Sequence, residues 1–263
     1  MQIKVSQLNQ INPGSETMRL LYTIWCAIWF VALYLVLFPF QFVFLQRENW
    51  KPLAHKVNYV WGMLFFIGAG MPVRVERRFR PDPKKVYVFC ANHFSYLDIA
   101  AMGVIVRNYY AFVGKSEVKH IPLLGYMFAK LHVQVDRSQP NSRAYSLAKS
   151  IRTLASGRSI MIFPEGGIKA TEPPQMVPFR DGAFTMAIQQ QVPIVPVTLL
   201  NNDQILPDRS PIRFHWHPLR AVIHPPIETK GMTQDDLERL KEETYKIIDA
   251  ELNKERKSER VKE

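Results

Sequence analysis

The hydrophobic residues of this chain are concentrated near its N-terminus. No charged residue occurs from Leu20 to Leu45, a stretch longer than the roughly 20 residues that cross the apolar core of a bilayer. Pro39 lies inside this stretch and is expected to kink or end its helix. A second apolar stretch, Val57–Met71, is short for a span and suits a helix that lies in the interface or re-enters the membrane. We therefore expect residues 1–71 to anchor the protein to a membrane; the alternative is a buried core helix.

After Pro72 the pattern changes to short strands that alternate with helices. Strand character is found over Val73–Phe79, Val86–Cys90, Tyr110–Val113, His132–Val135, Ile160–Phe163, Ile194–Leu199, Ile212–His215 and Ala221–Ile223. Helices are predicted over Ser142–Ser156, Gly182–Gln190 and Thr233–Glu251. This alternation predicts an α/β fold over residues 72–252, with a mixed, largely parallel sheet flanked by helices. Residues 253–263 are expected to form a charged tail.

Composition and charge narrow the range of partners. The net charge of +11 predicts attraction to anionic lipid headgroups, phosphorylated substrates or nucleic acid. Cys26 and Cys90 both lie in apolar runs, so a disulfide framework is not expected and a reducing compartment fits. Basic residues follow the first apolar stretch at Arg47, Lys51 and Lys56, and this mild bias favours the downstream side as cytoplasmic. We therefore expect a cytoplasmic (inner) membrane location, with the α/β domain on the cytoplasmic side.

A histidine and an aspartate stand where one predicted strand ends. Val86–Cys90 leads into Asn92 and His93, and Ser95 with Asp98 forms a capping-box sequence that starts a helix. An aspartate one turn into that helix can bond one imidazole nitrogen and leave the other free to take a proton from a substrate. This is the logic of a catalytic triad in which a substrate hydroxyl replaces the serine. The alternative is that Asp98 only caps the helix and His93 is an ordinary loop residue.

Three further stretches carry candidate chemistry. Phe163–Gly167 (FPEGG) follows another apolar strand, and its glycines leave backbone amides open to an anion such as phosphate. Gly114–Gly125 supplies lysines beside an apolar Ile-Pro-Leu-Leu. Val192–Val197 (VPIVPV) is a strand interrupted by prolines, which favours an edge or bulged strand. Each stretch alone is weak evidence, because glycine-rich turns and lysine-rich loops are commonly structural only.

Together these stretches resemble the glycerolipid acyltransferase family, and specifically the bacterial 1-acylglycerol-3-phosphate acyltransferases. The resemblance covers roughly Val86 to Val197, the four blocks stand in the family's order, and NHFSYLD carries its H-x4-D motif in His93 and Asp98. It implies that His93, oriented by Asp98, deprotonates the free hydroxyl of 1-acylglycerol-3-phosphate, which attacks an acyl thioester to give phosphatidic acid. The thioester would be acyl-CoA or acyl carrier protein carrying the chain, and no other cofactor and no metal is implied.

The resemblance also assigns residues to the acceptor. It implies that Glu165 and Gly166 bind the glycerol phosphate together with nearby cations, and that Lys115 helps to place substrate or stabilise the oxyanion. The family's third block usually continues with threonine and arginine, whereas this chain has Gly167 and Ile168. An aliphatic side chain cannot bind phosphate, so either the contact shifts or the acceptor is another lysolipid, such as a lyso-aminolipid. The candidates for a shifted contact are Lys169, Arg137 and Arg180.

Other classes of function fit the sequence less well. A serine hydrolase would need a G-x-S-x-G elbow, which does not occur, and Cys90 lies within a strand. A metal site at His93 and Asp98 lacks a third ligand, and an exposed strand accounts for His215 and His217. Anionic lipid and a phosphorylated substrate explain the positive charge more simply than nucleic acid does. We therefore expect a membrane enzyme with a lysophospholipid acceptor from the bilayer and no nucleic-acid partner.

Overall fold

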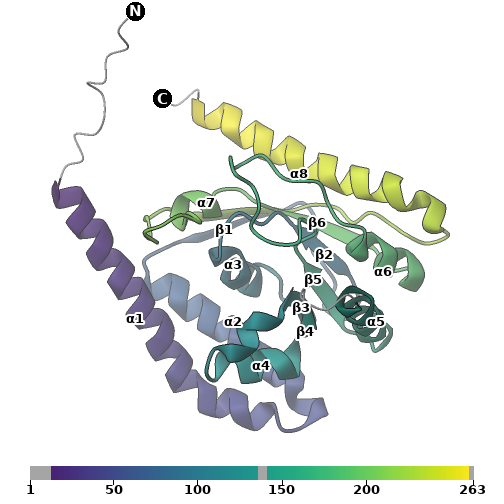
Figure 1. The fold of residues 1–263 in the computed structure, drawn as a ribbon, viewed down its shortest axis with the longest axis horizontal. Helices are drawn as coiled ribbons and strands as arrows, with labels where there is room; N and C mark the ends of the chain where they lie inside the picture. The colour runs from purple at the N-terminus through teal and green to yellow at the C-terminus, as the bar shows by residue number, and fades with distance from the viewer. Residues whose placement is uncertain (1–12, 136–140, 261–263) are drawn as a thin grey trace, which may run out of the picture.

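Two long helices precede a seven-stranded sheet in the computed structural model, which describes residues 13–135 and 141–260 (Figure 1). The helices are α1 (Pro13–Phe44), α2 (Lys51–Gly68), α3 (Leu97–Ile105), α4 (Leu124–Leu131), α5 (Ser142–Ala155), α6 (Gly182–Gln190), α7 (Asn202–Ile205) and α8 (Leu237–Arg260), with short 3-10 helices η1 (Glu48–Trp50), η2 (Ser116–His120) and η3 (Gln234–Asp236). The strands are β1 (Val73–Arg77), β2 (Val88–Ala91), β3 (Tyr110–Lys115), β4 (Val133–Val135), β5 (Ser159–Ile162), β6 (Ile194–Leu199) and β7 (Leu219–Ile223). The predicted alternation of strands and helices is confirmed.

The N-terminal helices α1 and α2 lie antiparallel and pack against each other. The hydroxyl of Tyr22, early in α1, donates to the carbonyl oxygen of Ala69, just after α2, at 2.8 Å. α1 continues through Pro39 to Phe44, so the proline does not end the helix. Among the described residues, one helix, Glu16–Phe44, is long and apolar enough to cross a membrane.

The sheet has the strand order β1-β7-β6-β2-β5-β3-β4, and its neighbours are parallel except for β6 and β7. This confirms the predicted mixed, largely parallel sheet. β6, which contains most of the VPIVPV stretch, lies inside the sheet between β7 and β2, so its interpretation as an edge strand is wrong. The pairing of β6 with β7 begins at Val197, one residue after Pro196.

The segment Ile212–His215 forms no strand, and its prediction as one is wrong. The backbone N–H of Phe214 donates to Thr23 Oγ1 on α1 at 2.9 Å. The N–H of His215 donates to the carbonyl oxygen of Ile205 at the end of α7, at 2.8 Å. These tertiary partners take the hydrogen bonds that a neighbouring strand would supply, and periodicity alone does not reveal them.

Helices cover both faces of the sheet, as expected where strands are mostly parallel. Along β2, Phe89 packs into the core formed with α2 and α3, while Cys90 packs into the core formed with α6 and α8. Figure 1 shows α8 along one side of the sheet and α2 with α3 on the other. α2 and α3 approach closely, since a Cβ atom at Gly62 would lie 2.7 Å from Cγ1 of Val104. Because β2 and β5 pair in parallel, their carboxyl ends lie at the same edge of the sheet, between the two layers of helices.

The last helix, α8, continues to Arg260, beyond the predicted helix end at Glu251. Arg78, which follows β1, donates to both carboxylate oxygens of Glu251, at 2.7 and 2.9 Å. Arg220 on β7 pairs with Glu255. The charged residues 253–260 are thus part of a helix that is tied to the sheet by ion pairs. The division of the chain into an anchor, a catalytic domain and a tail stays a prediction.

Candidate active site

Asn92 fixes the backbone where β2 leaves the sheet. Its Nδ2 donates to the carbonyl oxygen of Leu199 at 2.9 Å, and the N–H of Leu199 donates to Asn92 Oδ1 at 2.8 Å. These two bonds join the ends of β2 and β6, which are neighbours in the sheet. The turn that carries His93 therefore starts from a fixed position.

The structure brings His93 and Asp98 together. Nδ1 of His93 donates to Asp98 Oδ2 at 2.8 Å, since a carboxylate can only accept. The same oxygen accepts the backbone N–H groups of Phe94 and Ser95, at 2.8 and 2.9 Å. Asp98 is fully buried, so these donors replace the water that its carboxylate has lost. Because Nδ1 is engaged, Nε2 is the ring nitrogen available to exchange a proton with a substrate.

The capping interpretation and the catalytic interpretation of this motif describe the same contacts. Ser95 Oγ accepts the N–H of Leu97 at 3.1 Å, and the carboxylate of Asp98 accepts the N–H of Ser95. The carboxylate contact is that of a capping box, but the hydroxyl accepts from Leu97 rather than from Asp98. Regular helix begins at Leu97, two residues later than Ser95. The carboxylate of Asp98 thus bonds to the backbone that leads into α3 and to His93 at the same time, so its capping role and its catalytic role are compatible.

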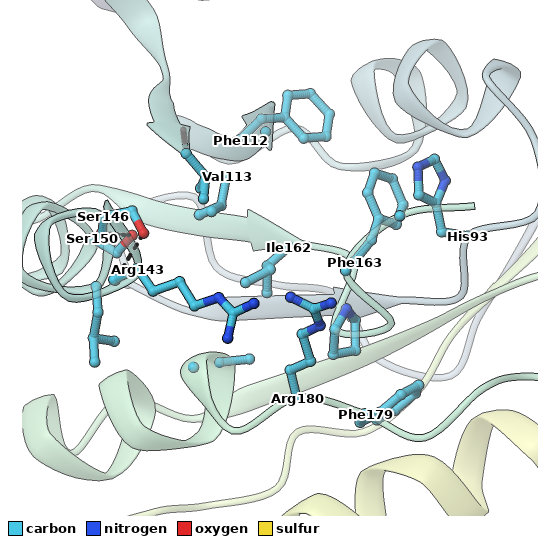
Figure 2. A pocket seen from close by; sticks show the side chains of 18 of the residues that line it. His93, Phe112, Val113, Arg143, Ser146, Ser150, Ile162, Phe163, Phe179 and Arg180 are labelled. Atoms are coloured by element: carbon cyan, nitrogen blue, oxygen red, sulfur yellow. Dashed lines mark hydrogen bonds between the residues drawn. The ribbon is translucent and has the colours of Figure 1, made fainter. Parts of the chain in front are cut away.

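Phe163, directly after β5, makes a contact that the sequence analysis did not identify. Its ring stacks on the imidazole of His93, with ring centres 4.1 Å apart and planes 14° from parallel (Figure 2). Stacking restrains the plane of the imidazole, while Asp98 fixes its rotation within that plane. The only signal in the sequence was that Phe163 and His93 both follow apolar strands.

Glu165 contacts the backbone of His93. Its Oε1 accepts the backbone N–H of His93 at 2.7 Å, and its Oε2 accepts that of Val177 at 3.2 Å. Burial raises the pKa of Glu165 to about 7, against the opposing effect of these two hydrogen bonds. Glu165 is not among the described residues that line the cavity beside His93. It braces the backbone of the site, and its expected contact with the substrate stays a prediction.

A cavity of about 800 Å³ opens beside His93, between the ends of β3 and β5 and the helices α5 and α6. Its walls include apolar side chains such as Phe112 and Phe128. Figure 2 shows the guanidinium groups of Arg143, from α5, and Arg180, from the loop before α6, pointing toward each other in this cavity. Neither pairs with a carboxylate in the part of the chain that the structure describes.

The glycines of FPEGG allow the chain and Arg180 to come close together. Gly166 has a φ of +78°, a conformation that favours glycine, and a Cβ atom there would lie 2.6 Å from Arg180 Nε. Gly167 also has a positive φ, of 141°. Both glycines and Ile168 line the cavity, so an aliphatic side chain occupies the position where the family usually has arginine.

The other residues predicted for the site are not among the described residues that line the cavity. Lys115 is the last residue of β3, and Lys169 is not among the described residues that line the cavity. Arg137 lies outside the described residues. The structure therefore gathers His93, the FPEGG glycines and Arg180 at one cavity, with Asp98 bonded to His93. It also adds Arg143, which the sequence analysis missed because a basic residue in the first turn of a helix is usually solvated.

Comparisons with known proteins agree on the family. The family model described as Acyltransferase matches residues 72–200. A chloroplast 1-acyl-sn-glycerol-3-phosphate acyltransferase of Brassica napus is 32% identical over 56% of this chain and 42% of its own length. A 1-acyl-sn-glycerol-3-phosphate acyltransferase of Saccharomyces cerevisiae is 32% identical over 59% of this chain and 51% of its own. This chain thus spans about half the length of the curated relatives it matches.

A solved structure has the same fold. The crystal structure of the 1-acyl-sn-glycerophosphate acyltransferase of Thermotoga maritima aligns with a TM-score of 0.75 and 21% identity, over 91% of this chain and 96% of that one. At this identity the likeness establishes the fold alone. The bacterial origin expected from the motifs stays a prediction, because the relatives above are from a plant and a yeast. On the family match and the H-x4-D spacing of His93 and Asp98, residues 72–200 of this chain belong to the acyltransferase family and are similar to 1-acyl-sn-glycerol-3-phosphate acyltransferases.

Proposed function

We propose that the protein transfers a fatty acyl chain from an acyl thioester to the free hydroxyl of 1-acylglycerol-3-phosphate, giving phosphatidic acid. The observation that carries this proposal is the His93–Asp98 pair at a cavity that also holds Arg143 and Arg180. A base, apolar walls and two cations suit a substrate with a hydroxyl, an acyl chain and a phosphate. The names of the Brassica and yeast relatives give the same acceptor for those proteins.

The reaction follows from the free nitrogen of His93. Nε2 accepts the proton of the acceptor hydroxyl while the hydroxyl oxygen forms a bond to the thioester carbonyl carbon. The resulting oxyanion re-forms the carbonyl and breaks the carbon–sulfur bond, and the leaving thiolate takes the proton from the imidazolium. Asp98 transfers no proton in this sequence, because its part is to hold Nδ1 and stabilise the imidazolium that forms.

We assign the phosphate of the acceptor to the basic side of the cavity. Ile168 occupies the usual position of the family's arginine, so another group must neutralise the phosphate. Arg143 and Arg180 present planar guanidinium groups, which bind phosphate oxygens in pairs. The backbone amides of Gly166 and Gly167 can add further donors. Further candidates remain among the cations predicted from the sequence, namely Lys115, Arg137 and Lys169.

We further propose that α1 and α2 hold the mouth of the cavity against the cytoplasmic face of the inner membrane. The outer surface of α1 exposes apolar side chains, among them Leu35, Val36 and Phe40. Tyr96 and Ile99, at the start of α3, are exposed and also line the cavity. An acceptor can then enter from the bilayer. The donor thioester arrives from the aqueous side on coenzyme A or on acyl carrier protein.

The experiment that decides the proposal compares the wild type with His93→Ala. Purified protein supplied with lipid is given a labelled acyl thioester and lysophosphatidic acid, and the labelled product is separated and counted. The substitution is expected to lower the rate about 100- to 10,000-fold, the usual contribution of a general base. Circular dichroism establishes that both proteins are folded. A folded wild type that acylates no lysolipid would overturn the proposal.

Ile168 also favours a second candidate, the same transfer to a lyso-aminolipid, which needs no phosphate-binding arginine. The assay above is repeated with a lyso-aminolipid and with Ile168→Arg. Wild type that prefers the lyso-aminolipid, and a variant that shifts toward lysophosphatidic acid, would establish this second acceptor. High use of lysophosphatidic acid by both proteins would exclude it.

A further inference from the structure

The carboxylate of Asp98 has another side-chain partner, Asn202 at the start of α7. Nδ2 of Asn202 donates to Asp98 Oδ1 at 2.8 Å. The opposite oxygen, Oδ2, accepts from His93 Nδ1 and from two backbone N–H groups. Within the part of the chain that the structure describes, Asn202 is therefore the donor that holds Oδ1.

The segment that carries Asn202 is attached to the His93 turn on both sides. Before it, Leu199 exchanges two hydrogen bonds with Asn92. After it, the carbonyl oxygen of Leu206 accepts the hydroxyl of Ser95 at 2.7 Å. Asn202 itself lies beyond residues 72–200, the region that the family model matches. The donor to Asp98 is thus fixed in place by contacts that flank it.

Packing alone does not account for an amide at this position. Asn202 is 1% exposed, and its Oδ1 has no hydrogen-bond partner among the described residues. A buried acceptor without a partner lowers the stability of the fold. A leucine of similar size would remove that unsatisfied oxygen. The bond that the amide donates to Asp98 is the interaction that explains its presence.

We propose that Asn202 is a positioning residue for acyl transfer, which keeps Oδ2 of Asp98 on Nδ1 of His93. The kinetic part of this inference rests on the proposed function. Without the amide, the carboxylate can rotate about its Cβ–Cγ bond and its buried charge loses a donor. Both changes weaken the stabilisation of the imidazolium in the transition state. They leave the cavity arginines untouched, so kcat falls while KM stays the same.

The first test pairs Asn202→Leu with the neighbouring substitution Asn201→Leu. Asn201 is also buried, and its side chain bonds to the carbonyl oxygen of Pro218 and the N–H of Arg220 rather than to Asp98. Asn202→Leu is expected to lower kcat about 10- to 100-fold with KM within about threefold of the wild type, as for the loss of a hydrogen bond to a charged group. Asn201→Leu is expected to keep the kcat of the wild type in its folded fraction.

A second substitution, Asn202→Asp, gives a signature that a structural role would not produce. The introduced carboxyl group donates to Oδ1 while it is protonated and repels Asp98 once it is ionised. The activity of this variant relative to the wild type therefore falls as pH rises, whereas that of Asn202→Leu stays level. Among the described residues, His93 is bonded to Asp98 and Glu165 interacts with it electrostatically. Both are present in every variant, so their effect is shared.

A readout without turnover separates this inference from the proposed function. With 15N-labelled histidine, the Nδ1–H proton of His93 on Asp98 gives a far-downfield NMR signal. In Asn202→Leu the signal is expected to shift or to disappear through exchange with water, whereas in Asn201→Leu it is expected to persist. If the leucine variant does not fold, Asn202→Asp at high pH replaces it in this test. An unchanged signal together with an unchanged kcat would overturn the role of Asn202. A wild type that acylates no lysolipid would overturn the proposed function, and the NMR signal would then decide the role of Asn202 alone.

Discussion

Two buried carboxyl groups flank His93, and they have different roles because they accept hydrogen bonds from different donors. Asp98 accepts from the imidazole and orients the ring. Among the described residues, the donors to the Glu165 carboxylate are backbone N–H groups, including that of His93, and Glu165 holds the turn on which the ring is mounted. Two side chains of similar chemistry thus control two separate degrees of freedom of one histidine.

Replacing Glu165 by glutamine is expected to change how stability depends on pH. The pKa of this carboxyl group is raised by burial to about 7 in the folded protein, from 4.5. A raised pKa means that the folded state binds more protons at this group than the unfolded state, so the contribution of Glu165 to stability is greatest below about pH 4.5 and falls as pH rises to about 7. The stability of Glu165→Gln relative to the wild type should therefore increase across this range, by on the order of 3 kcal/mol.

The measurement is chemical denaturation of both proteins in detergent at a series of pH values. Above about pH 7 the difference should level off, because the carboxyl group is then ionised in both states. A difference that is independent of pH, or that decreases from pH 4.5 to 7, would contradict the assigned cause of the shift.

At the scale of elements, the turn between η2 and α4 depends on close backbone contact. Leu123 has a positive φ of 62°, which is uncommon for a residue with a side chain. Two residues later, a Cβ atom at Gly125 would lie 2.2 Å from the carbonyl oxygen of Lys119. A backbone atom cannot swing aside as a side chain can. The final glycine of GKSEVKHIPLLG is therefore needed for the turn itself.

Gly125→Ala is expected to destabilise the protein by about 1–3 kcal/mol, the usual range for overpacking. Gly103→Ala is the matched control, since Gly103 also lies in a helix but an added Cβ there would meet no atom within 4 Å beyond its chain neighbours and the backbone of its own helix. It should be neutral or stabilising by up to about 1 kcal/mol, from helix propensity. Thermal unfolding in detergent measures both, and equal effects of the two substitutions would refute the packing argument.

Elements and contacts that depend on local sequence were predictable. His93 and Asp98 meet because they lie within one strand-to-helix turn, and Gly182–Gln190 follows its helical pattern. The contacts of Asn202 and Arg143 with this site arise from chain folding between distant segments, and neither residue has a local pattern that indicates them. The same cause explains the missed structure of Ile212–His215, whose backbone bonds to α1 and α7.

At the scale of the whole molecule, the long apolar helix predicts how the protein attaches to a membrane. The helix Glu16–Phe44 leaves most of its apolar side chains exposed, in contrast to a core helix. Burial of apolar surface in lipid is not screened by salt, whereas binding through the net charge of +11 would be. Washing membranes with concentrated salt therefore distinguishes attachment through apolar burial from attachment through charge.

Membranes that contain the protein are expected to retain it in about 1 M salt and release it only in detergent. Val36→Lys, on the exposed side of α1, should raise the fraction found in the supernatant after centrifugation. Asn253→Lys adds the same charge at an exposed position on α8 and should not. Complete release of the wild type by salt would show that charge alone attaches the protein.

The tight contact between α2 and α3 has a practical consequence. α3 carries Asp98 in its first turn, and its buried face rests on α2 where Gly62 meets Val104. A chain cut to begin at Pro72 would lose that support and uncover Val104 to water. Such a fragment would not be a water-soluble version of the enzyme. Biochemistry on this protein calls for the intact chain in nanodiscs or micelles, because α2, which supports the helix of Asp98, packs against α1, the helix expected to enter the lipid.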